Sequence, residues 1–174
     1  ARQVMERGLP GELALLPVVE SKLDPFARSA ESALGLWQFM PATADGLGLQ
    51  RDWWFDGRQD PVLATSAALD YLETLHNSFD GNWLLALAAY NTGEANVRSA
   101  LRRAGASSDD PDVFWSLRLN SETMRHIPRL LSLAALVSRN RQQPEELRLA
   151  FVGLQQDLVA TEVPAQIELA LAAE

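Results

Sequence analysis

Residues 15–25 of the sequence read LLPVVESKLDP, an almost wholly apolar run that ends in Glu20. A carboxylate at the edge of a buried segment costs free energy unless another group pairs with it or uses it. If the apolar residues before Glu20 line a cleft, they desolvate its carboxyl and raise its pKa from about 4.3 toward neutrality, as a general acid requires. The alternative is a solvated carboxylate at a helix end.

Helix signals surround this stretch. Pro10 is expected to open a first helix, and Pro17 to kink or break it. Asp60 and Pro61 predict the N-cap and first residue of a long helix that continues to about Ser78. Further helix starts are expected at Pro41, Asn82, Gly93, Asp110 and Ser121. The predicted fold class is mainly α, with about seven or eight helices.

Two parts of the chain fall outside this helical pattern. In the loop RDWWFDGRQD, Trp53, Trp54 and Phe55 are expected to form a structural aromatic cluster that pins the loop, with a sugar-stacking rim as the alternative. The composition changes from Pro144 onward. We therefore expect residues 1–140 to form the main helical domain and residues 141–174 a C-terminal appendage, or the truncated start of a following region.

The composition excludes several classes of function. Of the 174 residues, 47% are apolar, which suits a folded domain with a core. The formal net charge of -8 argues against a nucleic-acid partner, because phosphate-binding surfaces need an excess of Lys and Arg. The chain has no cysteine, and His76 and His126 lack metal-ligand spacing, so neither a metal nor another cofactor is predicted. Carboxylates remain as the candidate reactive groups.

Two further segments place polar side chains among apolar ones. Gln38 lies between large apolar residues in SALGLWQFMPATA, where an unpaired amide would cost about 1–3 kcal/mol unless a ligand or the backbone bonds it. Tyr90 and Asn91 end the apolar helix LALAAYNTGEANV. An aromatic ring can stack on the apolar face of a sugar while an amide bonds its polar groups.

These motifs together carry a family resemblance. With Glu20-Ser21, GLWQFMP at residues 35–41 and AAYNTGE at residues 88–94 in this order, the sequence resembles the family 1 lytic transglycosylases of bacteria. The segment SETMRHIPRLLSLAAL looks like a later helix of a membrane-bound subfamily. The resemblance covers about residues 9–140. It implies a lysozyme-like helical domain with a short C-terminal appendage.

The resemblance also implies an active site. Glu20 matches the catalytic glutamate, Ser29 a serine that orients the N-acetyl group of the substrate, and Tyr90 a tyrosine near the catalytic carboxyl. Glu122 resembles a second glutamate in the groove. The expected substrate-binding residues are Ser29, Gln38, Met40, Tyr90, Asn91 and Glu122. His126 stands where a tyrosine is common, a change expected to alter the floor near Glu122 without touching the catalytic motif.

Each of these residues also has an ordinary structural explanation. Gln38 could bond backbone in its loop, and Tyr90 could be a core tyrosine with a satisfied hydroxyl. Ser29 and Asn91 are common turn residues. The two remaining alternatives are core filling by Met40 and a favourable helix-dipole position for Glu122.

The implied reaction needs a single enzyme carboxyl. Glu20 would protonate the oxygen that links N-acetylmuramic acid to N-acetylglucosamine, while the acetamido group of the substrate stabilises the positive charge at C1. Ionised Glu20 would then take the proton of the C6 hydroxyl, and intramolecular attack would give the 1,6-anhydro product. Two alternatives stay open. One is a goose-type lysozyme-like hydrolase on the same fold, and the other is a non-catalytic peptidoglycan-binding domain.

The implied partner is the glycan strand of peptidoglycan. The substrate lies outside the inner membrane, so the resemblance implies a periplasmic enzyme that is associated with the outer membrane in its full-length form. It further implies LysM repeats after the catalytic domain and a monomeric state.

Overall fold

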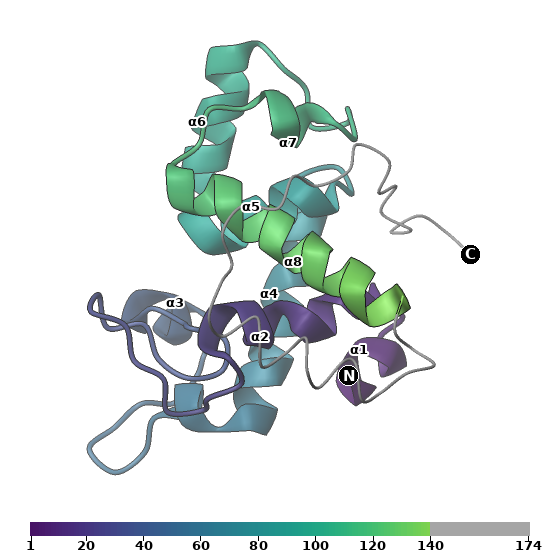
Figure 1. The fold of residues 1–174 in the computed structure, drawn as a ribbon. Helices are drawn as coiled ribbons and strands as arrows, with labels where there is room; N and C mark the ends of the chain where they lie inside the picture. The colour runs from purple at the N-terminus through teal and green to yellow at the C-terminus, as the bar shows by residue number, and fades with distance from the viewer. Residues whose placement is uncertain (140–174) are drawn as a thin grey trace.

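The computed structural model describes residues 1–139, which form helices joined by loops (Figure 1). The elements, with 3₁₀ helices labelled η, are α1 (Arg2–Glu6), η1 (Gly11–Leu15), α2 (Leu16–Ser21), α3 (Pro41–Gly46), η2 (Gly57–Gln59), α4 (Pro61–Ser78), α5 (Trp83–Thr92), α6 (Glu94–Ala104), α7 (Val113–Ser116) and α8 (Ser121–Arg139). β-Pairing within residues 1–139 is confined to isolated bridges. The predicted mainly α class is therefore confirmed.

The expected appendage, residues 141–174, lies outside the described residues. Within residues 1–139, no helix is both long enough and apolar enough to cross a membrane.

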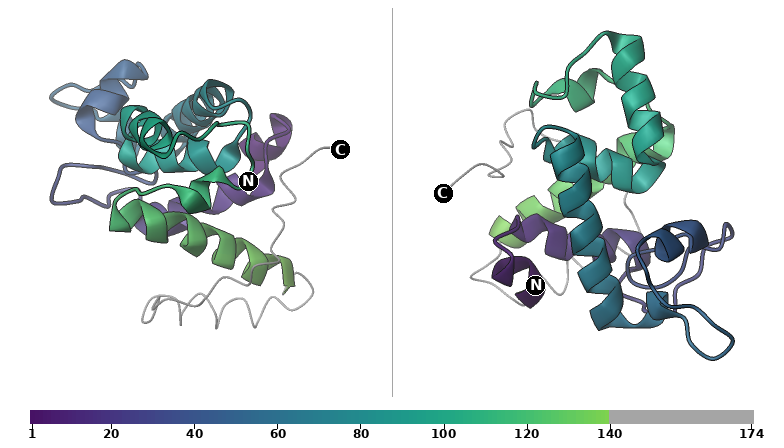
Figure 2. Two further views of the ribbon diagram at one scale, coloured as in Figure 1. Left: turned by 90° about the horizontal axis from the view of Figure 1, so that it is seen from above. Right: turned by 180° about the vertical axis from the view of Figure 1, so that it is seen from behind.

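Helix α5 forms the centre of the core. Its residues from Trp83 to Ala89 are all buried, and the helix contacts α4, α6 and α8. Helix α8 lies in front of α5 in Figure 1, and α4 lies in front in the reverse view of Figure 2. The run WLLALAA is apolar on every side, which is typical of a helix enclosed by other helices. Helix α5 thus carries its C-terminal residues into the middle of the molecule.

The side chains that cap α4 and α5 are the ones predicted from the sequence. The Asp60 carboxylate accepts hydrogen bonds from the backbone N–H groups of Val62 and Leu63, at 2.8 and 2.9 Å. The Asn82 side-chain oxygen accepts from the N–H of Leu85 at 3.1 Å. Gly93, at a φ of 91°, separates α5 from α6. The predicted starts of these helices are confirmed because local capping chemistry decides them.

Other boundaries differ from the prediction. The first helix is α1, and the segment after Pro10 is a 3₁₀ helix that gives way to α2 at Leu16, with Pro17 in the first turn of α2. The predicted break at Pro17 is confirmed. Helix α7 begins at Val113, three residues after the predicted start at Asp110. The cap of α8 is Asn120 and not Ser121, because the Asn120 side-chain oxygen accepts from the N–H of Thr123 at 2.7 Å.

The expectation that Trp53, Trp54 and Phe55 form a structural aromatic cluster was wrong. Trp53 and Trp54 are 86% and 91% exposed, and Phe55 is 39% exposed. The loop is held instead by the Asp52 carboxylate, which accepts from the backbone N–H groups of Trp54 and Phe55 at 2.8 and 2.9 Å. The segment between α3 and α4 extends away from the helices (Figure 1). Polar contacts of the backbone, and not ring packing, therefore hold this turn.

A buried arginine ties the irregular segment of residues 26–40 to η2. The Arg58 guanidinium is paired with Asp56 at 2.7 Å and donates to the carbonyl oxygens of Ser32 and Phe39, at 2.9 and 3.0 Å. Gly35 lies against the backbone of Arg58, where an added Cβ would be 1.9 Å from the carbonyl oxygen. Only glycine fits there, and its φ of 82° also favours glycine.

The close approach at Gly35 predicts a large loss of stability on substitution. We expect Gly35→Ala to lower the free energy of unfolding by several kcal/mol, because two backbone segments must separate. Gly48→Ala is the matched control: its φ is 72° and an added Cβ meets nothing within 4 Å. The control should lose only about 1 kcal/mol in urea titrations, and equal losses for the two variants would contradict this account.

The exposed tryptophans predict the opposite behaviour. The double variant Trp53→Ser, Trp54→Ser should change the free energy of unfolding by less than about 0.5 kcal/mol, because neither ring is buried. Trp37 is 2% exposed and its indole N–H donates to Thr65 at 2.9 Å. Trp37→Ser should lower the same quantity by about 3–5 kcal/mol. A comparable loss from the double variant would show that the rings do support the fold.

Candidate active site

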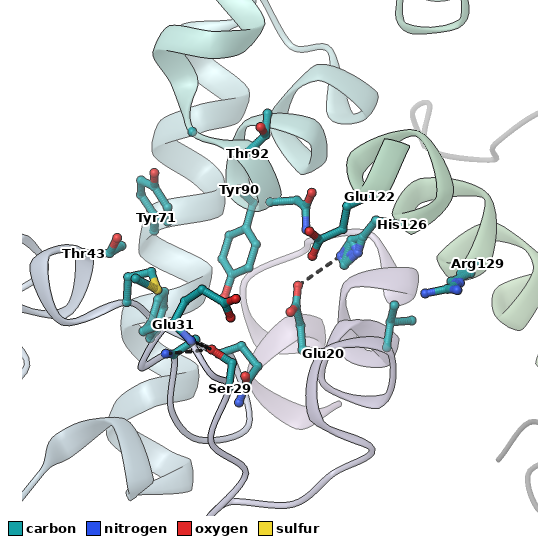
Figure 3. A pocket seen from close by; sticks show the side chains of 17 residues that line it. Glu20, Ser29, Glu31, Thr43, Tyr71, Tyr90, Thr92, Glu122, His126 and Arg129 are labelled. Carbon is teal, nitrogen blue, oxygen red and sulfur yellow. Dashed lines mark hydrogen bonds and ion pairs between the residues drawn. The ribbon is translucent and has the colours of Figure 1, made fainter. Parts of the chain in front are cut away.

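One cavity of about 650 Å³ brings the sequence-predicted site residues together (Figure 3). Its walls come from α2, the irregular segment of residues 26–40, α3, α4, the end of α5, and α8. All seven predicted residues line it: Glu20, Ser29, Gln38, Met40, Tyr90, Asn91 and Glu122. Their positions in the sequence are up to about a hundred residues apart, so the fold and not local structure assembles the group.

Glu20 is the most strongly perturbed acid of the cavity. It is the last residue but one of α2, and its side chain is only 13% exposed. Burial raises the pKa of Glu20 to about 8, and the nearby charge of Glu122 adds to the rise. Of the apolar residues before it, Val19 lines the cavity and Leu16 is in the core. The predicted desolvation is thus present, and Glu20 is mainly protonated at neutral pH.

His126 contacts Glu20 directly. Its Nε2 lies 3.0 Å from Glu20 Oε1, and its side chain is 8% exposed (Figure 3). Burial lowers the pKa of His126 to about 4, with a further contribution from the positive charge of Arg129. The imidazole is therefore neutral at neutral pH. The expectation that His126 would not touch the catalytic motif was wrong, because α8 turns this side chain toward the end of α2.

The irregular segment supplies a hydroxyl and an amide that are already bonded to backbone. Ser29 Oγ accepts from the N–H groups of Glu31 and Ala33, both at 3.1 Å. The Gln38 side-chain nitrogen donates to two backbone carbonyls, at 3.1 and 2.9 Å, and its φ of 48° is left-handed. The NH₂ group of Gln38 is thus not left unpaired for a ligand. Gln38 therefore bonds backbone within its loop, which was the alternative explanation for this residue, and it also lines the cavity.

Met40 faces the cavity and is not core filling. Its side chain is 42% exposed, and Met40 lies immediately before α3. A flexible, exposed thioether next to polar groups offers an adaptable apolar surface.

Tyr90 and Asn91 reach the cavity from the end of the buried helix α5. The Tyr90 hydroxyl donates to the carbonyl of Trp37 at 2.7 Å, and its ring lies tilted against Phe39 and Tyr71. Burial, followed by the charge of Glu20, raises the pKa of Tyr90 well above its ordinary value. Asn91 Oδ1 accepts from the Thr123 hydroxyl at 2.6 Å. The Tyr90 hydroxyl and the Asn91 side-chain oxygen are therefore both already hydrogen-bonded within the protein.

Several lining residues were not predicted from the sequence. Glu31, in the polar loop, adds a carboxylate to that of the predicted Glu122, which is exposed on α8, and Arg129 adds a cation. Nothing in the sequence around Glu31 singles it out. His126 could have been found, because it follows Glu122 by four residues and so lies on the same face of α8.

Comparisons with known proteins give consistent results. The transglycosylase SLT domain matches residues 1–113. The chain is 38% identical to membrane-bound lytic murein transglycosylase D of Escherichia coli over all 174 residues, and it spans 38% of that protein's length. The predicted resemblance to lytic transglycosylases, and to their membrane-bound subfamily, is therefore confirmed.

Two solved structures share the fold. The 70 kDa soluble lytic transglycosylase of E. coli is 25% identical, with a TM-score of 0.58 over 71% of this chain and 21% of that one. An inactive mutant of the lytic transglycosylase Slt of Pseudomonas aeruginosa, in which a glutamate is replaced by glutamine, is 27% identical. Its TM-score is 0.62 over 81% of this chain and 23% of that one. The predicted lysozyme-like fold is confirmed.

Glu20 and His126 act on stability with opposite signs as the pH changes. Between about pH 4.5 and 8 the folded chain keeps a proton on Glu20 that the unfolded chain releases, so stability falls as pH rises. Between about pH 4 and 6.5 the unfolded chain binds a proton on His126 that the folded chain does not, so stability rises with pH. Above pH 6.5 the contribution of His126 fades and that of Glu20 dominates.

We therefore expect these two groups to make the free energy of unfolding fall by about 1 kcal/mol between pH 6.5 and 8. Glu20→Gln should abolish that fall and raise stability at the upper end of the range, because the amide cannot ionise. Urea titrations across this range measure it. Glu6→Gln, at a side chain that is 64% exposed, is the control and should keep the fall. A fall that survives in Glu20→Gln would contradict the assignment.

Proposed function

The chain belongs to the transglycosylase SLT domain family, and we propose that it is a lytic transglycosylase of peptidoglycan with Glu20 as its catalytic acid and base. The bond cleaved would be the β-1,4 linkage between N-acetylmuramic acid and N-acetylglucosamine. One observation carries the proposal: a carboxyl that is 13% exposed and mainly protonated at neutral pH lines a cavity large enough for sugar units.

The first step uses the proton of Glu20. The carboxyl donates it to the glycosidic oxygen, the bond from that oxygen to C1 of the muramyl residue breaks, and N-acetylglucosamine leaves as an alcohol. The acetamido oxygen of the muramyl residue stabilises the positive charge at C1, so a second enzyme carboxylate is not required. The raised pKa of Glu20, about 8, supports this step because the acid must hold its proton until the substrate binds.

The second step returns the proton. The Glu20 carboxylate takes it from the C6 hydroxyl of the same muramyl residue, whose oxygen then bonds to C1 and gives the 1,6-anhydro end. The attacking group is tethered to the reacting carbon, which gives it a high effective concentration. Glu20 ends as it began, protonated, and no water is consumed.

The remaining polar groups of the cavity complement a sugar that carries an acetamido group. Ser29 Oγ accepts from two backbone N–H groups, so its own hydrogen is available to donate to a substrate oxygen. Asn91 uses its oxygen to accept from Thr123 and keeps its NH₂ for the substrate. Gln38 has the reverse arrangement, with its NH₂ on backbone and its oxygen left to accept. Met40 supplies the apolar contact.

A second candidate is a hydrolase on the same fold. Glu31 and Glu122 both line the cavity with Glu20, so a second carboxylate is available to activate a water molecule. Water would then replace the C6 hydroxyl at C1. The two reactions use the same acid and differ only in the nucleophile.

The setting of the full-length protein follows from the substrate. We propose a periplasmic enzyme that acts as a monomer on glycan strands and is held at the outer membrane in its complete form. LysM repeats after the catalytic domain would add a second contact with peptidoglycan. The name of the E. coli relative, a membrane-bound murein transglycosylase, supports the membrane association.

The test is mass spectrometry of the soluble products from purified peptidoglycan. We expect anhydromuropeptides from the native chain and from Glu6→Gln, an exposed control, and none from Glu20→Gln, because the amide cannot donate or accept the proton. The P. aeruginosa relative supports this expectation, since a single change of glutamate to glutamine makes that enzyme inactive.

Two outcomes would overturn the proposal. Products one water heavier, with a free reducing end, would establish the hydrolase, and Glu31→Gln and Glu122→Gln would then identify the second carboxylate. Binding to peptidoglycan without products from any variant would indicate a non-catalytic binding domain.

A further inference from the structure

The carboxyl of Glu20 has one polar partner within residues 1–139, the imidazole of His126. The two are on different elements, α2 and α8, and their side chains are 13% and 8% exposed. Glu122 and Arg129 on α8 and Glu31 in the irregular segment also line the cavity, and Tyr90 reaches it from α5. Among these charged and titratable groups, His126 is therefore the one that contacts the Glu20 carboxyl directly.

The His126 nitrogen needs this contact. Nε2 is shielded from water and has no aligned hydrogen bond, although Oε1 of Glu20 lies 3.0 Å away. A buried polar nitrogen without a partner is costly, and Oε1 is the acceptor within reach. Hydrogen bonds of catalytic groups are often poorly aligned without substrate and tighten when it binds.

We propose that His126 is a positioning residue that donates its Nε2–H to Oε1 of Glu20, so that the acidic proton is kept on Oε2. The catalytic consequence rests on the proposed function, because it concerns the oxygen from which Glu20 delivers its proton. The opposite arrangement, with the proton on Oε1 and donated to a bare Nε2, would direct the acid toward the histidine and away from the substrate.

The surroundings favour the donor arrangement. Burial and the positive charge of Arg129 keep the imidazole neutral, so the ring carries one N–H. When Glu20 gives up its proton, the resulting carboxylate is buried beside the like charge of Glu122. An N–H that points at Oε1 stabilises this carboxylate, whereas a lone pair would repel it. The same hydrogen bond therefore serves the acid step and the base step.

Nuclear magnetic resonance can test the arrangement without any activity. The chain has two histidines, and His76, stacked on Trp83 at 4.0 Å between ring centres, serves as an internal reference. Long-range correlation of ring protons with ring nitrogens at neutral pH should identify His126 as the neutral Nε2–H tautomer. The Nδ1–H tautomer, or an imidazolium ring, would overturn the proposal.

Two variants of His126 test whether Nε2 donates to Glu20 or accepts from it. His126→Leu removes the donor, whereas His126→Gln keeps an N–H at a similar reach. The carboxyl carbon signal of Glu20 should titrate at higher pH in the Leu variant, because the carboxylate loses its hydrogen bond, and close to native in the Gln variant. A lower or unchanged midpoint in His126→Leu would show that Nε2 is an acceptor or plays no part.

The kinetic readout separates positioning from a structural role. His126→Leu should lower kcat by about one order of magnitude or more with little change in KM, and should move the alkaline limb of the kcat profile upward. His126→Gln should restore most of the activity, and His76→Leu is the control. Equal losses in the Leu and Gln variants would overturn the proposal. Absence of lytic activity in the native chain would count against the proposed function alone, since the resonance measurements still decide the contact.

Discussion

The buried guanidinium of Arg58 fixes the irregular wall of the cavity, and the rest of the site depends on that wall. Residues 26–40 contain no helix, so they lack a continuous set of backbone hydrogen bonds of their own. Arg58 supplies the missing donors to Ser32 and Phe39 while Asp56 neutralises its charge. A buried cation is tolerated when it is paired and hydrogen-bonded in this way. The site therefore relies on an arginine that does not line the cavity.

The opposite wall is built differently. Helix α5 delivers Tyr90 and Asn91 from the centre of the apolar core, and α8 presents Glu122 and His126 across from α2. Glu20 lies where these parts meet, next to polar groups, with its side chain largely shielded from solvent. Burial there disfavours its charge, which reduces stability at neutral pH and keeps the proton available. Stability and reactivity thus oppose each other at one carboxyl.

The sequence predicts what local chemistry decides. Asp60, Asn82 and Gly93 mark helix boundaries by capping or by a left-handed φ, and the structure follows them. Asn120 displaced Ser121 as the cap of α8 because both are good capping residues and only side-chain geometry distinguishes them. Tertiary contacts were harder to predict. The approach of His126 to Glu20 joins residues more than a hundred positions apart, and ring exposure in the Trp53 loop depends on what the fold leaves uncovered.

The two walls of the cavity share one anchor in the core. The wall on α5 separates only if the apolar core itself comes apart, so its opening is tied to global unfolding. The wall of residues 26–40 is fastened to the same core, because Trp37 is buried, its indole N–H donates to Thr65 and its carbonyl accepts from the Tyr90 hydroxyl. Local opening of either wall would therefore expose buried aromatic surface. The cavity should keep its shape until the whole domain unfolds.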